Sequence, residues 1–378
     1  MTDESSPLPA AADDRLRNHL RLAMVPGVGP RTRQSLLARF FTPEGVLAAP
    51  MDRLRDVPGV GPKLARAITS ADRDLDVDAQ LDLCRNNHVR LLPDYDEAYP
   101  PSLKEIDDPP GLLFLRGSLR PEDRLAVAIV GTRHATHYGL RQAERLAGGL
   151  ARAGVTVVSG LARGIDAAAH RGALAAGGRT LAVLGSGVLN IYPPEHDMLA
   201  EELIEHGALI SESPPQASPR TGSFPQRNRI ISGLALGTVI VEAGLRSGAL
   251  ITARLAAEQN REVFAVPGRV DDRSAQGCHR LLRDGAALVE SVDDILEHLG
   301  PLAHPAPKEN GPEIRHPAEL QLNELEQKVL SAIGTDPTSV DRLVSQTGLP
   351  VARILSTLSV LEMRRIIRRV TGTTVVRI

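Results

Sequence analysis

Short apolar runs separated by amphipathic segments dominate the chain between residues 125 and 268. Runs rich in β-branched residues, most of them ending in Gly or Ser, predict six strands, at 125–131, 155–160, 180–185, 208–213, 236–244 and 262–268. Segments with helical periodicity lie between several of these strands and end in glycine, as at 140–154 and 167–178. Strands that alternate with helices predict an α/β domain with a Rossmann-like, doubly wound, mostly parallel sheet that is covered on both faces.

A hexapeptide occurs twice near the start of the chain. Residues 25–30 and residues 57–62 both read VPGVGP, and a basic segment with helical character follows each copy. A Gly-x-Gly turn at the start of a helix presents backbone N–H groups to an anion, and this pattern resembles the helix-hairpin-helix pair, a DNA-backbone-binding unit. Arg31, Arg33 and Lys63 are the candidate phosphate contacts. The alternative is a compact SAM-like helical domain that uses these glycines only for packing.

The pattern changes again after residue 299. Residues 300–318 are rich in Pro, Gly and charge, and they predict a linker that cannot fold alone. Beyond it, three helices and a small β wing are expected, with a Gly-centred turn between two of the helices as in helix-turn-helix modules. A winged helix of this kind binds either duplex DNA or a protein partner, and the sequence leaves both open. The residues available for duplex DNA are Arg353, Arg364 and Arg365.

These patterns divide the 378 residues into four parts: a small all-α domain at 1–80, the Rossmann-like domain at 81–299, the linker at 300–318 and the winged-helix domain at 319–378. The two cysteines, Cys84 and Cys278, belong to no CxxC or Cys/His cluster, so the sequence indicates neither a disulfide framework nor a metal site. It contains no cofactor motif. No run reaches the ~20 apolar residues of a membrane span, and we expect a cytoplasmic protein without a membrane partner.

The charge pattern narrows the choice of ligand. A formal net charge of -2 excludes a uniformly basic nucleic-acid binder, but it permits a local basic site. Ligands of parallel sheets bind at the carboxyl ends of the strands. The segments that follow the predicted strands combine glycines, which allow close approach of the main chain, with arginines, whose guanidinium groups suit phosphate. These residues are Gly131, Gly160, Gly164, Gly185, Gly187, Arg133, Arg163, Arg220, Arg227 and Arg229.

Aromatic residues add a second kind of contact at the strand ends. The chain has 4 Tyr, 5 Phe and no Trp, and Tyr138, Tyr192 and Phe224 all fall in these segments. Rings at such positions either stack on nucleobases or fill crevices. The stretch SFPQRNR, residues 223–229, is expected to be a loop beside a buried strand, with Phe224 meeting a base and Arg227 meeting a phosphate.

Three polar residues have structural interpretations. Arg229 is expected to pair inward with Glu212 or Glu242 at least as readily as it contacts a ligand. Asp166 begins a predicted helix, where the dipole stabilises a carboxylate that orients the glycine turn. His170 is expected on the flank of the same helix, where it does not act as a base.

Two enzyme classes with this fold are alternatives. A dinucleotide-binding oxidoreductase requires G-x-G-x-x-G after the first strand, and residues 131–139 lack it. A nucleotide phosphoribohydrolase is the better alternative, because LALGTVIVEAG at 234–244 resembles the PGGxGTxxE signature of the lysine decarboxylase-like enzymes. The paired glycines are replaced here, and Glu242 lies one residue too far from Gly237 and Thr238 to be the catalytic carboxylate. No other catalytic set occurs in the sequence, so we expect no enzyme.

The motifs, taken in order, resemble those of the DNA processing protein A family (DprA, also called Smf), over about residues 90–295. The motifs are VGTR at 130–133, SGLARGIDAAAH at 159–170, VLGSGVLNIYPPEH at 183–196, FPQRNRIISGL at 224–234 and VIVEAGLRSGALITA at 239–253, followed by VPGR. The resemblance implies a recombination mediator of competent cells that binds and protects incoming single-stranded DNA. It also implies a homodimer that helps load the recombinase RecA during natural transformation.

The resemblance also assigns site residues. It places Arg133 and the segment 224–228 in a strand-binding pocket, with an amide floor formed by the glycines of the strand ends. Relatives often carry a lysine shortly before the FP motif, where this chain has Arg220. The complete expected site for single-stranded DNA is Gly131, Thr132, Arg133, Ser159, Gly160, Arg163, Gly164, Asp166, Gly185, Gly187, Tyr192, Arg220, Phe224, Arg227, Asn228 and Arg229. Contacts to duplex DNA through the terminal domains fall to Arg31, Lys63, Arg353, Arg364 and Arg365.

Overall fold

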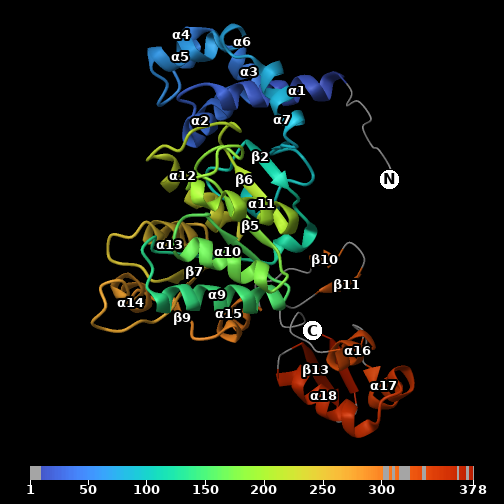
Figure 1. Cartoon of the computed structure of the whole chain (residues 1–378). Coiled ribbons are helices and arrows are strands. Elements are labelled where there is room, and N and C mark those ends of the chain that lie inside the picture. The colour runs from blue at the N-terminus through green and yellow to red at the C-terminus, as the bar shows by residue number, and fades with distance from the viewer. Residues whose placement is uncertain are drawn as a thin grey trace. The chain divides into compact units, whose positions relative to one another are not determined.

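The structure is a computed structural model (Figure 1) that describes residues 10–300, 306–308, 311–314, 324–333, 338–363, 366–371 and 374–377. The chain forms two compact units. Unit 1 contains the described residues up to Ser118 together with Leu181–Leu234, and unit 2 contains Leu119–Thr180 together with the described residues from Ala235 onward. The four-part division drawn from the sequence stays a prediction.

Unit 1 begins with a helical segment and continues into strands. Its elements are α1 (Ala10–Met24), α2 (Pro30–Phe40), α3 (Pro43–Leu47), α4 (Met51–Arg55), α5 (Pro62–Thr69), α6 (Ala71–Asp74), α7 (Val77–Asn86), β1 (Arg90–Pro93), α8 (Pro101–Lys104), β2 (Leu112–Gly117), β5 (Thr180–Val183), the 3-10 helix η2 (Pro194–His196), α11 (Asp197–His206), β6 (Gly207–Ser211) and α12 (Ser223–Leu234).

Unit 2 contains the alternating strands and helices and the C-terminal module. Its elements are the 3-10 helix η1 (Pro121–Arg124), β3 (Ala126–Gly131), α9 (His137–Arg152), β4 (Thr156–Ser159), α10 (Ile165–Ala175), β7 (Gly237–Val241), α13 (Ala249–Glu258), β8 (Glu262–Ala265), α14 (Gln276–Arg283), β9 (Ala287–Leu288), α15 (Val292–Leu299), β10 (Ala306–Lys308), β11 (Gly311–Ile314), α16 (Glu324–Ser331), β12 (Thr338–Ser339), α17 (Val340–Thr347), α18 (Val351–Met363), β13 (Ile367–Thr371) and β14 (Thr374–Arg377).

The strands of unit 1 have the hydrogen-bonded order β1-β2-β6-β5, and those of unit 2 have the order β4-β3-β7-β8-β9. In unit 2, β3 pairs in parallel with β4 and β7, and β7, β8 and β9 continue the parallel arrangement. In unit 1, β2 pairs antiparallel with β1 and β6. The six predicted strands are all present, and the mostly parallel α/β fold is confirmed. The sequence analysis missed β1, β2 and β9.

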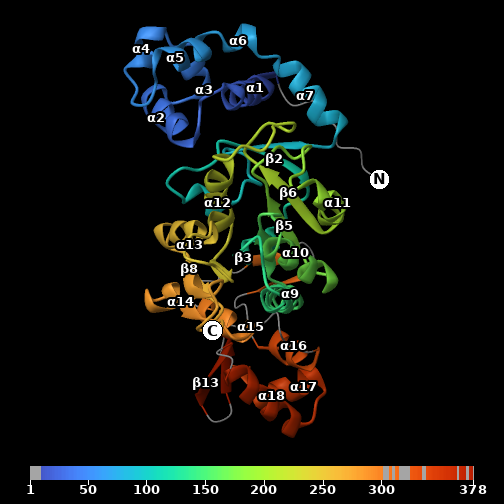
Figure 2. The ribbon, with the colours of Figure 1, turned by 60° about the vertical axis from the view of Figure 1, so that its left-hand side comes forward.

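Helices cover both faces of the parallel strands of unit 2. Helices α9 and α10 lie side by side on one face, and α13 lies on the other (Figure 2). The inner face of α9 consists of Ala143, Leu146, Ala147 and Leu150, which recur with helical spacing and are all inaccessible to solvent. Thr136 caps the start of α9, because its hydroxyl accepts a hydrogen bond from the main-chain N–H of Gly139 (3.2 Å).

The repeated hexapeptide forms two equivalent turns. Gly27 and Gly59 have positive φ angles of 96° and 85°, a conformation that favours glycine. Gly29 and Gly61 are the N-cap residues of α2 and α5, and a proline follows each of them at the first helical position. The sequence correctly predicted a tandem of short helices joined by glycine turns.

The C-terminal module has the three helices and the small β wing that the sequence predicts. Gly348, with a φ of +69°, ends α17 and makes the expected turn into α18. Ile354, Leu358 and Leu361 form the buried face of α18. Within the predicted linker the structure describes a pair of short antiparallel strands, β10 and β11, which the sequence analysis did not foresee. No helix in the described ranges is long and apolar enough to cross a membrane.

The two cysteines provide a test of the core. Cys84 and Cys278 are both free and fully buried. Burial raises the pKa of the Cys278 thiol to about 11, and it raises the pKa of Cys84 as well. Because the thiolate is the reactive form, we expect neither cysteine to react with DTNB in the native protein at a pH of about 8, and both to react in guanidinium chloride. Counting reactive thiols before and after unfolding checks this, and rapid labelling of the native protein would contradict the buried placement.

Candidate nucleic-acid interface

In unit 2, the segments that follow β3 and β4 pack main chain against main chain. The N–H of Thr132 donates to the carbonyl of Glu242 (2.8 Å), and the carbonyl of Thr132 accepts from the N–H of Ile165 (3.3 Å). Gly164 has a φ of +74°, and a Cβ atom at this position would lie 2.4 Å from the carbonyl oxygen of Thr132. Only glycine permits this approach. The close packing of the segment 131–133 against the segment 162–166 therefore depends on Gly164.

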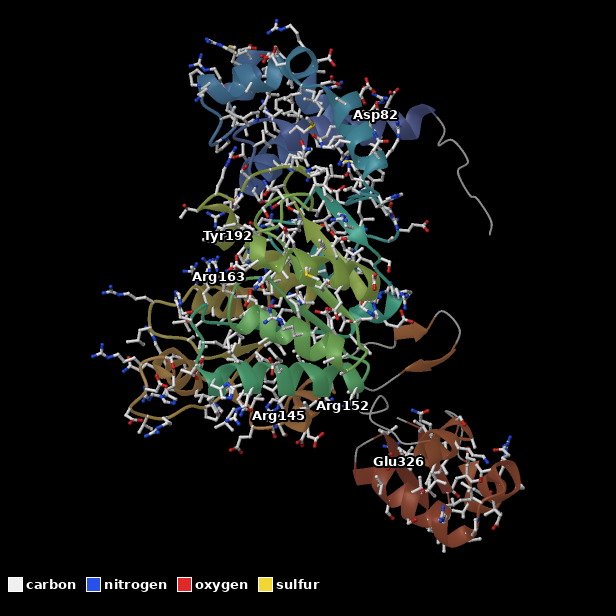
Figure 3. The ribbon with its side chains drawn as sticks, viewed as in Figure 1. Asp82, Arg145, Arg152, Arg163, Tyr192 and Glu326 are labelled. Atoms are coloured by element: carbon white, nitrogen blue, oxygen red, sulfur yellow. The ribbon has the colours of Figure 1, made fainter. Side chains whose placement is uncertain are left out.

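Two arginines project from these packed segments. Arg133 and Arg163 are both exposed, and the side chain of Arg163 is labelled in Figure 3. Asp166 lies in the first turn of α10, as the sequence predicts, but it is buried. Ser159 is a correction: its hydroxyl is fully buried and donates to the carbonyl of Ile129 (2.6 Å), so it has no surface for a ligand.

In unit 1, the glycines that follow β5 support an aromatic pair. A Cβ atom on Gly185 would lie 2.8 Å from the ring of Phe224, and one on Gly187 would lie 2.1 Å from the carbonyl oxygen of Pro215. These glycines allow ring and main chain to pack closely. The rings of Phe224 and Tyr192 have their centroids 5.7 Å apart at 47°, and 37% of Tyr192 is exposed. The sequence placed both rings at strand ends, but their contact depends on the fold.

The segment SFPQRNR is helical, contrary to the sequence analysis, which expected a loop. It forms the first turns of α12, and the apolar run that follows is divided between the end of α12 and strand β7. The inner face of α12 consists of Arg227, Ile230, Ile231 and Leu234, which have helical spacing. Because the first of these inner positions is an arginine and not an apolar residue, the helical periodicity of the segment was not recognised in the sequence. Arg227 is buried and donates to the carbonyl of Val183, so its expected contact with phosphate is also corrected.

Arg229 has the internal role that the sequence analysis considered. Its side chain is 4% exposed and forms ion pairs with Asp108 (3.3 Å) and Glu212 (2.6 Å). Burial raises the pKa of Glu212, and the Arg229 guanidinium opposes that rise. These contacts place the Arg229 guanidinium in the interior, away from a surface ligand.

The other expected members of the unit 1 site lie next to α12. Arg220 is exposed and precedes the helix, and its carbonyl oxygen accepts a hydrogen bond from the hydroxyl of Ser223 (2.8 Å). Asn228 is half-buried on the second turn of α12. Of the unit 1 arginines expected to contact single-stranded DNA (Arg220, Arg227 and Arg229), Arg220 alone presents an exposed side chain.

Two residues on which the enzyme alternatives depend have structural partners. His170 is fully buried, not on a helix flank as expected, and its Nδ1 lies 2.7 Å from the hydroxyl of Thr180. The buried carboxylate of Glu242 accepts hydrogen bonds from the N–H (2.8 Å) and hydroxyl of Thr136, and the hydroxyl of Ser274 lies 3.3 Å away. Glu242 therefore holds the start of α9 in place. Its carboxylate is already engaged by Thr136, so it is not available as the catalytic acid of the hydrolase alternative.

The candidates for duplex DNA differ in exposure. Arg31 and Lys63 are exposed near the N-termini of α2 and α5. Arg33, which was expected to contact phosphate, is 13% exposed and is paired with Asp94 (3.1 Å) instead. Arg353 is exposed on α18. Arg364 and Arg365 lie outside the described residues.

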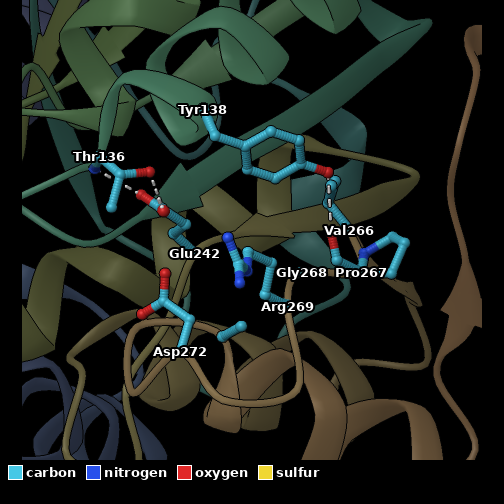
Figure 4. Close-up of a pocket in the computed structure, with 9 residues that line it drawn as sticks. Thr136, Tyr138, Glu242, Val266, Pro267, Gly268, Arg269 and Asp272 are labelled. Atoms are coloured by element: carbon cyan, nitrogen blue, oxygen red, sulfur yellow. Dashed lines mark hydrogen bonds between the residues drawn. The ribbon is translucent and has the colours of Figure 1, made fainter.

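Unit 2 contains a cavity of about 380 Å³ that was not predicted from the sequence. It lies near the start of α9 and the ends of β7 and β8 (Figure 4), and its lining includes Tyr138, Glu242, Arg269 and Asp272. The position of Tyr138 at a strand end was the only signal for it.

Family models match three parts of the chain. Residues 90–300 match DNA recombination-mediator protein A, residues 313–373 match the DprA winged helix domain, and residues 20–74 match a SAM-like helix-hairpin-helix tandem. These matches agree with the three kinds of fold that the sequence predicted.

Individual relatives agree with these models. Protein Smf of Synechocystis sp. is 34% identical over 93% of this chain and 96% of its own length, and protein Smf of Escherichia coli is 42% identical over 76% of each chain. Among solved structures, DprA from Streptococcus pneumoniae has a TM-score of 0.65 and 34% identity over 74% of this chain and 96% of its own. DprA from Helicobacter pylori has a TM-score of 0.52 and 30% identity over 57% of this chain and 97% of its own. The family models and the relatives match both the sheet with its motifs and the winged helix, and this chain belongs to the DNA recombination-mediator protein A family.

Proposed function

We propose that this protein is a non-enzymatic recombination mediator that binds single-stranded DNA through the strand-end segments of its two units. The observation that carries the proposal is the pair of exposed arginines, Arg133 and Arg163, on segments locked together at Gly164. A rigid main chain holds the two guanidinium groups at the surface, and such groups bind phosphate with charge-assisted hydrogen bonds.

Unit 1 contributes the base contact in this proposal. Phe224 and Tyr192 form an aromatic pair backed by Gly185, and aromatic faces stack on bases of any sequence. Arg220 supplies a further exposed charge ahead of α12. The work on the Helicobacter pylori relative concerns its binding of single-stranded DNA, which supports the same ligand class here. Protection of incoming strands, dimerisation and loading of RecA during natural transformation belong to the proposal as further roles.

We expect the protein to bind a single-stranded oligonucleotide more tightly than the corresponding duplex, with a steep dependence on salt. Each phosphate that the arginines neutralise contributes a slope of about -0.7 to log K against log salt for single strands. Fluorescence anisotropy over a series of salt concentrations measures both the preference and the slope. A flat salt response, or equal affinity for duplex, would rule out a phosphate-based strand site.

The hydrolase alternative is tested on the same preparation. Incubation with nucleoside monophosphates, followed by chromatography, detects free base if Glu242 supports glycoside cleavage. We expect none, because the Thr136 N–H and hydroxyl already hold this carboxylate. Release of base at a catalytic rate, abolished by Glu242→Gln, would favour the enzyme over the mediator.

A further inference from the structure

The cavity of unit 2 has one aromatic wall. The hydroxyl of Tyr138 donates to the carbonyl of Pro267 (2.9 Å), which ties the ring to the segment after β8 (Figure 4). The ring is 41% exposed, and Val266 and Ala275 add apolar surface to the lining. A volume of about 380 Å³ is in the range of small-ligand sites. A planar group that enters this cavity meets a positioned aromatic ring.

The polar part of the lining is rich in acceptors. Asp272 accepts the N–H and the hydroxyl of Ser274 (both 2.8 Å), and both bonds end on its Oδ1, so its Oδ2 is available for a ligand. Glu242 lies beside it in the lining with a φ of +52°, a strained conformation for a residue other than glycine. Because Thr136 holds both oxygens of Glu242, the carboxylate of Asp272 is the acceptor for a ligand, and it selects a group that donates N–H hydrogen bonds.

Arginines occupy the segments that border the cavity. Arg269 belongs to the lining and is exposed, with Asp271 as its partner. Arg246 and Arg273 are exposed on the segments after β7 and β8, and these segments meet where Gly244 packs against the main chain of Arg273. Neither Arg246 nor Arg273 forms an ion pair with a described residue. Their positive charge favours an anion outside the cavity and disfavours a lysine or arginine side chain of a partner protein.

We propose that this cavity binds a nucleotide whose base carries an exocyclic amino group. The base stacks on Tyr138, its amino group donates to the carboxylate of Asp272, and its phosphate meets the bordering arginines. Cytosine, adenine and guanine have such an amino group, whereas thymine offers only its ring N3–H, which lies between two carbonyl oxygens that repel a carboxylate. The nucleotide is either free or part of a bound strand. The second case rests on the proposed function and extends it, because it adds a base-selective contact to a sequence-tolerant site.

Mononucleotides test the free form on the full-length protein. We expect dCMP and dAMP to bind about tenfold or more tightly than dTMP in titration calorimetry, since the carboxylate contact is a charge-assisted hydrogen bond. Tyr138→Ala should abolish the binding that calorimetry detects, and Tyr138→Phe, which keeps the ring, should retain it. Asp272→Asn should reduce the difference between dCMP and dTMP to less than about threefold. Asp293→Asn changes an exposed aspartate of unit 2 outside the lining and should have no effect.

Oligonucleotides test the strand form. We expect a short oligothymidylate with several central cytosines to bind more tightly than plain oligothymidylate, and Asp272→Asn to remove the difference while plain oligothymidylate still binds. Selectivity in either format supports the inference, and the format that shows it identifies the source of the nucleotide. Equal binding of all bases in both formats, or displacement of dCMP by an arginine-rich peptide, overturns it. If the wild-type protein binds no oligonucleotide at all, the proposed function fails separately.

Discussion

Replacing Arg229 with methionine is expected to lower the free energy of unfolding by about 3 kcal/mol, the lower end for breaking a buried ion pair, because the change leaves two partly buried carboxylates without their cation. The Arg229 side chain is 4% exposed, and its guanidinium pairs with Asp108 and Glu212. Methionine fills a similar volume, so the loss reports the charge and not a cavity. Urea denaturation monitored by circular dichroism measures the effect.

The pH dependence of this loss identifies its cause. Burial already raises the pKa of Glu212, and removal of Arg229 raises it further. A pKa of Glu212 that is higher in the folded than in the unfolded state means that the folded protein binds this proton more tightly. The free energy of unfolding therefore rises as the pH falls through the folded-state pKa, and it decreases as the pH rises through that value. The deficit of Arg229→Met relative to wild type should therefore shrink at acidic pH.

An exposed arginine provides the matched control. Arg254 is 70% exposed and pairs with Glu258 on α13, and Arg254→Met is expected to change stability by less than about 0.5 kcal/mol. An Arg229→Met protein with wild-type stability but weaker DNA binding would show that Arg229 contacts the strand instead.

Replacing Arg133 with alanine is expected to weaken binding of single-stranded DNA by about 1.5–3 kcal/mol, roughly 10- to 150-fold, without loss of stability. Arg133 is exposed, and main-chain hydrogen bonds of Thr132 to Glu242 and Ile165 hold its segment in place. The side chain is therefore expected to contribute to the ligand more than to the core. Arg133→Lys should recover part of the loss, since lysine keeps the charge without the planar fork. Anisotropy titrations and thermal unfolding on the same preparations measure both quantities.

Arg171→Ala is the control for Arg133, because Arg171 is exposed on α10 of the same unit and no strand contact is proposed for it. We expect its affinity to match wild type. Unchanged affinity in Arg133→Ala would refute the phosphate contact. A parallel loss of affinity and melting temperature would assign Arg133 a role in holding the segment.

The local pattern of the sequence was sufficient for the elements of the fold. The β-branched runs predicted β3 to β8 because buried parallel strands are apolar throughout, and this composition is visible without the partner strands. The VPGVGP repeat predicted two glycine turns because the need for a positive φ is a property of each turn itself. The exposed positions of Arg133 and Arg163 agree with their place in the segments that follow β3 and β4.

The partners of buried polar groups were decided only by the tertiary structure. In the sequence, Arg227 and Arg229 cannot be distinguished from Arg133, because all three are arginines in segments near strand ends. The fold brings the carbonyl of Val183 to Arg227. It brings Asp108 and Glu212 to Arg229. These partners allow both arginines to occupy buried positions of α12, and for this reason the segment is a helix where a loop was expected. The sequence gives each side chain its chemistry. Whether that chemistry serves the core or a ligand depends on which groups surround it, since a buried charge is stable only when paired.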